Sequence, residues 1–230
     1  METSRYDDRL SEILRKSSAV MAEKGYHRAS MRDISAATGI SLSGLYYYFK
    51  SKEELLFLIQ EHCFGMLLDQ LQAELKEVSD PRTRLERFIQ LHIGFFAQSM
   101  PEMKVLSHEA DSLSGEYRHR VTELKRAYTE ELSSILDDLL SETDTPGGSV
   151  PAPGDPGASS RATTFALFGM LNWLYTWYRP DRDPPAPELA EQFAQLFLHG
   201  FLSGAPPHPP EEPTGQLSTS SQAAQPRTFF

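Results

Sequence analysis

Residues 30–49 constrain the fold of this chain most strongly, because two helix caps and a glycine stand at fixed spacings. The stretch reads Ser-Met-Arg-Asp-Ile-Ser-Ala-Ala-Thr-Gly-Ile-Ser-Leu-Ser-Gly-Leu-Tyr-Tyr-Tyr-Phe. Ser30 is a favourable N-cap, and Asp33 follows in the first turn, where the helix dipole stabilises a negative charge. Gly39 suits a turn with positive φ, which glycine adopts without strain. The pattern predicts a first short helix that ends at Gly39, with Ile34 and Ala37 on its inner face.

A second short helix is predicted at about residues 41–48, with one apolar and one polar side. Ser41 is its predicted N-cap, while Leu45 and Phe49, four residues apart, point inward. The positions left to face outward are Ser41, Leu42, Ser43, Gly44, Tyr46 and Tyr47. Two helices around a glycine turn, with hydroxyl groups outward on the second, are typical of a helix-turn-helix that reads DNA. Spacing alone fits an ordinary helical hairpin equally well.

The flanking sequence favours the DNA-binding interpretation. An amphipathic pattern upstream predicts a helix that ends at Gly25, and Ser51 is predicted to cap another helix downstream, with Glu54 completing a capping box. Gly25-Tyr26, the stretch 30–39 and Leu-Tyr-Tyr-Tyr-Phe-Lys-Ser-Lys-Glu-Glu-Leu at 45–55 resemble the DNA-binding domain of the tetracycline-repressor (TetR) family. This resemblance covers residues 7–67 without a gap.

The remaining sequence predicts helices and no sheet, since alternation of β-branched residues does not occur. We expect an all-α fold with a three-helix head and a six-helix body, which the resemblance also implies. The body helices are predicted at 51–78, 82–98, 101–113, 115–142, 160–178 and 186–202. The expected domains are a DNA-binding domain at 7–67, an effector-binding and dimerisation domain at 68–203 with a flexible Pro- and Gly-rich loop at 144–159, and a disordered tail at 204–230.

The charge of the chain is distributed unevenly. Its net charge is −10, but residues 1–54 hold nine Lys or Arg against eight Asp or Glu, whereas the remainder holds 13 against 24. The acidic residues therefore concentrate in the part that need not approach DNA. This asymmetry supports a DNA-binding head weakly, because a net charge near zero is not a basic patch.

Enzyme motifs are missing from the sequence. It contains no G-x-S-x-G, P-loop, G-x-G-x-x-G, H-E-x-x-H or paired cysteines, so we expect no enzyme, no catalytic residue and no cofactor. His108, Glu109 and Asp111 are spaced so that they cannot share one helix face, and no metal site is expected. Cys63 is the only cysteine, which excludes an internal disulfide and suits a buried thiol in a reducing compartment. No apolar run approaches about 18 residues, so we expect a cytoplasmic protein, associated with the nucleoid through DNA.

The resemblance implies a DNA-binding role for particular residues. The helix at about 41–48 would enter the major groove, with Ser41, Leu42 and Ser43 nearest the base edges. Phosphate contacts map onto Ser30, Arg32, Tyr46, Tyr47, Lys50 and Lys52. Two interpretations of Tyr47 stay open, contact with a base and packing on Lys50. Family members often carry threonine where this chain has Gly44, so we expect specificity to depend on phosphate register, on Leu42 and on DNA shape.

The body is expected to provide a dimer interface and an effector site. The helix at 160–178 is apolar around most of its circumference and must be covered on both sides, as in the four-helix dimer bundle of the family. The stretches 107–118, 125–128 and 166–180 resemble regulators that respond to acyl-CoA thioesters and control the degradation of fatty acids, steroids or aromatic acids. The implied effector residues are apolar Phe95, Phe96, Met103, Leu106, Phe168 and Trp173, and cationic Arg118, Arg120, Arg126 and Arg179. As alternatives, these aromatic residues are core and these arginines pair with carboxylates.

The sequence therefore predicts a homodimeric repressor that binds an inverted-repeat operator in double-stranded DNA and is released by a small hydrophobic effector, in the sharpest form an acyl-CoA thioester. Three alternatives stay open. The chain is a regulator of the same family with another effector or none, a helical module without DNA binding, or an acyl-CoA-binding enzyme.

Overall fold

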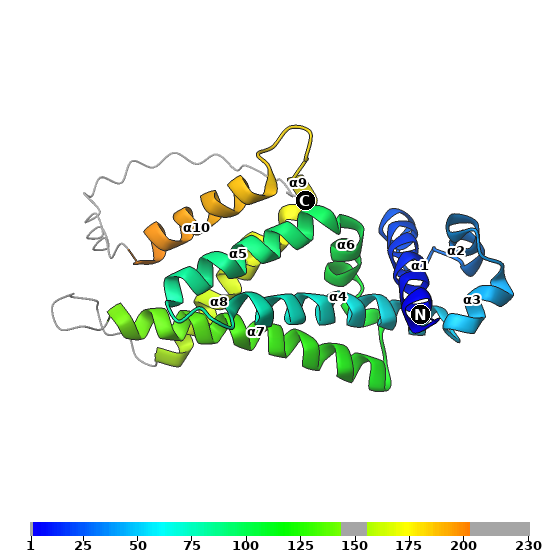
Figure 1. The fold of residues 1–230 in the computed structure, drawn as a ribbon, viewed down its shortest axis with the longest axis horizontal. Helices are drawn as coiled ribbons and strands as arrows, with labels where there is room; N and C mark the ends of the chain where they lie inside the picture. Colours follow the sequence, from blue (N-terminus) through cyan, green and yellow to red (C-terminus); the bar gives the residue numbers. More distant parts are fainter. Residues whose placement is uncertain (1, 144–155, 203–230) are drawn as a thin grey trace, which may run out of the picture.

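The computed structural model describes residues 2–143 and 156–202, and these residues form only helices and their connections (Figure 1). The prediction of an all-α fold is confirmed. The elements are α1 (Glu2–Lys24), α2 (Met31–Thr38), α3 (Leu42–Tyr48), α4 (Lys52–Leu75), α5 (Pro81–Gln98), α6 (Met100–His108), the 3₁₀ helix η1 (Ala110–Ser112), α7 (Gly115–Thr143), α8 (Pro156–Asn172), α9 (Leu174–Trp177) and α10 (Ala186–Leu202). None of the described helices is long and apolar enough to cross a membrane.

The head, α1 to α3, occupies one end of an elongated molecule, and the long helix α4 runs from it into the body (Figure 1). Within the body α7 packs against α4, α5 and α8, and α10 packs against α5. The helix α6 is the part of the body that packs most extensively against α1. The chain thus connects head and body in two ways, covalently through α4 and by packing through α6.

Local chemistry sets the ends of α2. The Ser30 hydroxyl accepts from the Asp33 N–H at 3.2 Å, and the Asp33 carboxylate accepts from the Ser30 N–H at 2.8 Å, so the capping box is complete. Gly39 ends the helix with φ 71°. Ile34 is buried as predicted, but Ala37 is exposed and Thr38 is buried in its place. Thr38 lies four residues after Ile34, which keeps the two on one face.

Two predicted body helices are divided in the structure. The helix predicted at 160–178 is broken at Trp173 into α8 and α9, and the helix predicted at 101–113 becomes α6 and η1. The helix α8 begins at Pro156, within the range predicted as a loop. Residues 144–155 of that loop, and the predicted tail at 204–230, lie outside the described residues.

A candidate nucleic-acid interface and a cavity in the body

The N-terminus of α3 is capped by Ser41. Its Oγ accepts from the Gly44 N–H at 3.1 Å and lies 3.1 Å from the Ser43 Oγ. On the inner side, Leu45 and Phe49 are buried in the head core. The burial of these two residues leaves the opposite face of α3 open to solvent, as the sequence predicts.

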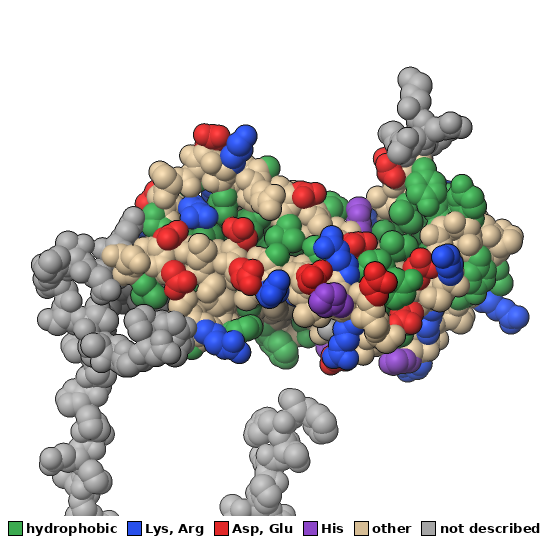
Figure 2. All heavy atoms as spheres, turned by 90° about the horizontal axis from the view of Figure 1, so that it is seen from below, with side chains coloured by type: hydrophobic (Ala, Val, Ile, Leu, Met, Phe, Trp, Pro, Cys, Tyr) green, Lys and Arg blue, Asp and Glu red, His purple; other side chains and the backbone are tan. Residues whose placement is uncertain are grey.

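Exposed aromatic and aliphatic side chains cover this open face. Tyr47 is 75% exposed, Tyr46 49% and Leu42 37%, and Figure 2 shows hydrophobic side chains gathered at the head end of the molecule. The Tyr47 ring meets Tyr48 edge-on at 5.4 Å and Tyr6 of α1 at 6.3 Å. Tyr6 in turn stacks on Tyr48 at 5.2 Å. Tyr47 thus contacts two tyrosines, of which Tyr6 supports α3 from α1.

Gly44 has a steric role in addition to its lack of a side chain. A Cβ atom at this position would lie 2.8 Å from Cγ2 of Ile40 and 3.2 Å from the Ser41 Oγ. Because Cγ2 branches directly from the Cβ of Ile40, it cannot move without a change of rotamer or backbone. A side chain at position 44 would therefore require Ile40 or the turn between α2 and α3 to shift, whereas glycine fits without rearrangement.

Two kinds of cationic side chain surround α3. Arg32 and Lys50 are exposed, as phosphate-binding residues must be. Lys52 is half-buried, and its Nζ donates to the carbonyl oxygens of Tyr26, His27 and Ala29 at 2.9, 3.3 and 3.1 Å. An ammonium group has three donors, so all of them are engaged with the segment between α1 and α2.

The cap of α4 differs in detail from the prediction. The Ser51 Oγ accepts from the Glu54 N–H at 3.0 Å as expected. The Glu54 carboxylate accepts from the N–H of Lys50 rather than of Ser51. The reciprocal hydrogen bond is therefore shifted by one residue toward the N-terminus, and it orders the exposed connection between α3 and α4.

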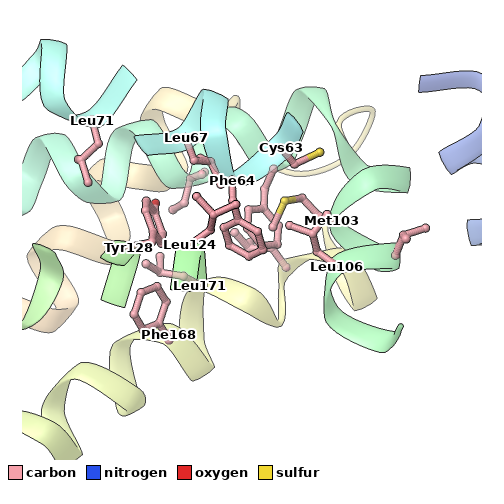
Figure 3. Packing of buried hydrophobic residues seen from close by; sticks show 14 of the residues in the cluster. Cys63, Phe64, Leu67, Leu71, Met103, Leu106, Leu124, Tyr128, Phe168 and Leu171 are labelled. Carbon is pink, nitrogen blue, oxygen red and sulfur yellow. The ribbon is translucent and has the colours of Figure 1, made fainter. Parts of the chain in front are cut away.

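The body contains a partly open cavity of about 460 Å³ between α4, α5, α6, α7, α8 and α9. Figure 3 shows Phe64 and Leu67 from α4 between Met103 and Leu106 on one side and Tyr128 and Phe168 on the other. The full lining is Phe64, Leu67, His92, Met103, Leu106, Ser107, Lys125, Tyr128, Thr129, Phe165, Phe168, Gly169, Asn172, Trp173 and Tyr175. Most of these side chains are apolar, and the volume suits a small molecule.

The predicted effector residues divide into two groups. Met103, Leu106, Phe168 and Trp173 line the cavity. Phe95 instead lines a cleft on the other side of α5, and Phe96 lies in the core, where it stacks on His92 at 4.5 Å.

The predicted arginines lie elsewhere. Arg118, Arg120 and Arg126 form ion pairs with Asp111, Glu61 and Glu130, while Arg179 donates to the carbonyl oxygen of Tyr178.

Sequence reasoning missed the polar part of this lining. Lys125 is the cationic side chain among the lining residues, and its Nζ lies 5.7 Å from the centre of the Phe64 ring. Burial lowers the pKa of Lys125, and the charge of Asp111 opposes this shift. The stretch Lys-Arg-Ala-Tyr at 125–128 indicates an effector site in the sequence, but the resemblance implies its arginine, Arg126, as the effector residue rather than Lys125.

A buried histidine also belongs to the lining. His92 is 2% exposed, and its Nδ1 lies 3.0 Å from the Tyr128 Oη. Burial lowers the pKa of His92 to about 3, and the side chain of Asn172 opposes this shift only in part. The imidazole is therefore neutral at physiological pH, and it acts in the cavity wall as a hydrogen-bonding group rather than as a charge.

The helix α6 connects this cavity to the head. Met103, Leu106 and Ser107 contribute to the lining, while the residue after α6, Glu109, accepts from the Tyr26 N–H at 3.2 Å. Tyr26 follows the glycine that ends α1. A displacement of α6 would therefore act directly on the segment that joins α1 to α2.

Comparison with known proteins places both parts of the chain in one family. Residues 13–59 match the family described as bacterial regulatory proteins, tetR family, and residues 78–201 match the tetracyclin repressor-like C-terminal domain. The first match contains α2 and α3, and the second contains every lining residue of the cavity outside α4.

Individual relatives agree with this assignment. The chain is 24% identical to the fatty acid metabolism regulator protein of Bacillus subtilis, over 83% of this chain and 94% of the relative. A TetR-family regulator from Bordetella parapertussis is 29% identical, with a TM-score of 0.73 over 84% of this chain and 96% of that one. AibR, solved in complex with isovaleryl coenzyme A and operator DNA, is 25% identical, with a TM-score of 0.69 over 82% and 97%. The chain belongs to the tetR family of bacterial regulatory proteins, and it is a DNA-binding transcriptional regulator rather than an enzyme.

Proposed function

We propose that this protein is a homodimeric repressor, which binds an inverted-repeat operator and is released when an acyl-CoA thioester occupies the cavity. The observation that carries the proposal is the position of α6, which lines the cavity on one side and packs against α1 on the other. A ligand that displaces α6 would change how the head is held. Two heads whose separation no longer matches successive major grooves, about 34 Å apart, would lose the operator.

The DNA-facing residues of this proposal are those of the exposed face of α3 and the cations beside it. Ser41, Leu42, Ser43 and Tyr46 would contact base edges or the DNA backbone, with Ser30, Arg32 and Lys50 on phosphates. The hydrogen bond between the Ser41 Oγ and the Gly44 N–H would position the backbone of α3 against the DNA. Tyr47 would extend the DNA-facing surface toward Tyr6 on α1. The family pattern also assigns Lys52 to a phosphate, although its donors are engaged with carbonyl groups.

The exposed apolar side chains of the body support a dimer. Phe165 and Trp173 are 53% and 61% exposed, and Leu196 on α10 is 65% exposed. Exposed apolar side chains of this size are typical of protein interfaces. The family's dimer mode, in which the last long helices of two subunits form a four-helix bundle, would cover them.

The chemistry of the cavity supports an acyl thioester as effector. Its walls are mostly apolar, which suits an acyl chain, and Lys125 provides a cation for a negatively charged ligand. Among the relatives, AibR was solved with isovaleryl coenzyme A, and the relative from Bacillus subtilis is a fatty acid metabolism regulator. A different hydrophobic effector would use the same walls and is distinguished by the next experiment.

We expect acyl-CoAs of graded chain length to release the protein from the DNA upstream of its own coding region in a mobility-shift assay. The best ligand, at about 100 times its Kd, is expected to raise the melting temperature by roughly 5–10 °C, because it binds only the folded state. If no acyl-CoA releases the DNA or raises the melting temperature, the effector is not an acyl-CoA, and the repressor assignment stands by itself.

Matched variants of Glu109 test the proposed route through α6. Glu109→Ala removes the acceptor of the Tyr26 N–H, whereas Glu109→Gln retains a carbonyl oxygen at the same place. We expect Glu109→Ala to bind the acyl-CoA as wild type does but to need about 10 times more of it for half-release, in line with typical coupling energies. Glu109→Gln should behave like wild type; equal release by all three proteins would contradict this route.

Replacement of Lys52 distinguishes a phosphate contact from a clamp on the carbonyl groups. Lys52→Met leaves three carbonyl oxygens without their donor, so we expect the free energy of unfolding of the head to fall by about 1–3 kcal/mol. In the operator titration, the slope of log K against log salt should stay as in wild type. A slope reduced by about 0.9 for each lost contact would instead show that Lys52 neutralises phosphates.

A further inference from the structure

The buried His92 lacks one hydrogen bond that its chemistry requires. Its Nδ1 is paired with the Tyr128 Oη at 3.0 Å, whereas its Nε2 has no partner at ordinary hydrogen-bond geometry among the residues that the structure describes. The side chain of Asn172 interacts with the imidazole but does not close such a bond. A polar atom that is buried without a partner destabilises the fold. His92 and Tyr128 both belong to the cavity lining. The Nε2 atom itself is closed to a water-sized molecule, so a ligand oxygen contacts it once a neighbouring side chain of the wall moves aside.

The hydrogen bond to Tyr128 determines which role Nε2 plays. If Nδ1 carried the proton and donated to Oη, both the Tyr128 hydroxyl hydrogen and the Nε2 lone pair would be buried without partners. If the hydroxyl of Tyr128 donates to Nδ1, only one group stays unpaired, the N–H at Nε2. The second arrangement leaves fewer unpaired groups, so Nε2 is a donor and needs an acceptor.

The surroundings limit the chemistry of that acceptor. Phe88, Phe96 and Phe168 surround the His92 ring at centroid distances between 4.5 and 6.1 Å. Such walls favour an uncharged oxygen over a carboxylate, because an ion would lose its hydration there. The Asn172 side chain, also in the lining, acts on the same imidazole and offers a second hydrogen-bonding group beside it.

We infer that His92, oriented by Tyr128, donates a hydrogen bond from Nε2 to a carbonyl oxygen of the effector, and that this contact selects carbonyl-bearing ligands over hydrocarbon ligands of the same shape. The inference rests on the proposed function in taking the cavity as the effector site. The oxygen has two chemical sources, the thioester carbonyl and a keto group farther along the acyl chain. Both require the same donor.

Three CoA derivatives separate these sources by isothermal titration calorimetry. All three share the two amide carbonyls of the pantetheine arm. Octanoyl-CoA adds the thioester carbonyl, the S-octyl thioether adds none, and a thioether whose alkyl chain ends in a methyl ketone adds only the remote one. We expect wild type to bind one of the two carbonyl-bearing derivatives about 10-fold more tightly than the S-octyl thioether, the ratio for one hydrogen bond of about 1.4 kcal/mol. Equal affinities for all three would overturn the inference.

Variants of the pair show whether His92 is responsible. The double variant His92→Phe, Tyr128→Phe keeps the aromatic volume and removes both polar groups. We expect it to bind the S-octyl thioether still, and the ratio of the two affinities, preferred carbonyl derivative to thioether, to fall to about 1. His92→Gln places an amide donor near the position of Nε2 and should restore part of the ratio. Retention of the ratio in the double variant would show that another group reads the carbonyl.

A ligand pair without CoA keeps this test independent of the proposed effector. Acetophenone and α-methylstyrene have the same shape and differ in a carbonyl against a methylene group. If no CoA derivative binds, the acyl-CoA assignment fails, and the subsite is decided by whether acetophenone raises the melting temperature more than α-methylstyrene in a His92-dependent manner. No difference between these two ligands would then reject the subsite as well.

Discussion

A Ser41→Ala, Tyr46→Ala double variant is expected to lose at least about 100-fold of its operator affinity while it stays a dimer. Both side chains are exposed on α3, and each contact of this kind contributes about 1–3 kcal/mol to DNA binding. Because a dimer carries two heads, each substitution removes its contribution to operator binding twice. The measurement is a fluorescence-anisotropy titration with operator DNA, with sedimentation velocity to follow the oligomeric state.

The capping role of Ser41 must be separated from contact with DNA. Its Oγ accepts from the Gly44 N–H, so its loss also weakens α3 by about 1 kcal/mol. Ser51→Ala removes an equivalent cap from α4 and provides the matched control, because Ser51 lies outside the predicted interface. Affinity near wild type in the double variant would mean that α3 is not the helix that reads DNA.

Leu196→Glu is expected to convert the protein into monomers and, through this, to weaken operator binding by about 100-fold or more. Leu196 is the most exposed large apolar side chain among residues 186–199, the part of α10 whose burial the structure describes, whereas Ala194, Phe197 and Leu198 beside it are buried. A carboxylate at Leu196 would be desolvated in the interface but costs little in a free subunit. Two linked heads bind far more tightly than one, since the second head binds at high effective concentration.

A matched charge change tests whether this effect is specific. Gln72→Glu adds the same charge to an exposed position of α4 and should leave both sedimentation and DNA binding unchanged. The far-UV circular dichroism spectrum of Leu196→Glu should match that of wild type, because the substituted position faces solvent in the single subunit. A dimer that persists in Leu196→Glu would place the interface elsewhere.

The head could be predicted from sequence because its determinants are local. The caps at Ser30 and Ser41 and the left-handed Gly39 act within a few residues of themselves, and the structure has all three. The structural role of Lys52 was not predictable in this way, because its partners lie 23 to 26 residues upstream and meet it only after α1 and α4 have packed.

The cavity was predicted less well because its lining depends on how helices rotate against one another. On α5 the residues at 92, 95 and 96 are all aromatic or imidazole, and sequence pattern did not determine which of them faces the ligand. Packing places Phe95 toward a cleft and Phe96 in the core, and it leaves His92 at the cavity. Likewise Arg126 extends into solvent beside Glu130, while its neighbour Lys125 turns inward.

The close approach of Gly44 to Ile40 bears on how this protein could acquire a new target sequence. A side chain added at position 44 would collide with Ile40 in the turn that orients α3, so substitution there is disfavoured unless the residue at position 40 changes with it. Leu42, Ser43 and Tyr46 carry no such restriction, because their side chains extend into solvent. Retargeting by directed evolution should therefore proceed through these three positions, and libraries randomised at position 44 should yield folded clones mainly when residue 40 is varied as well.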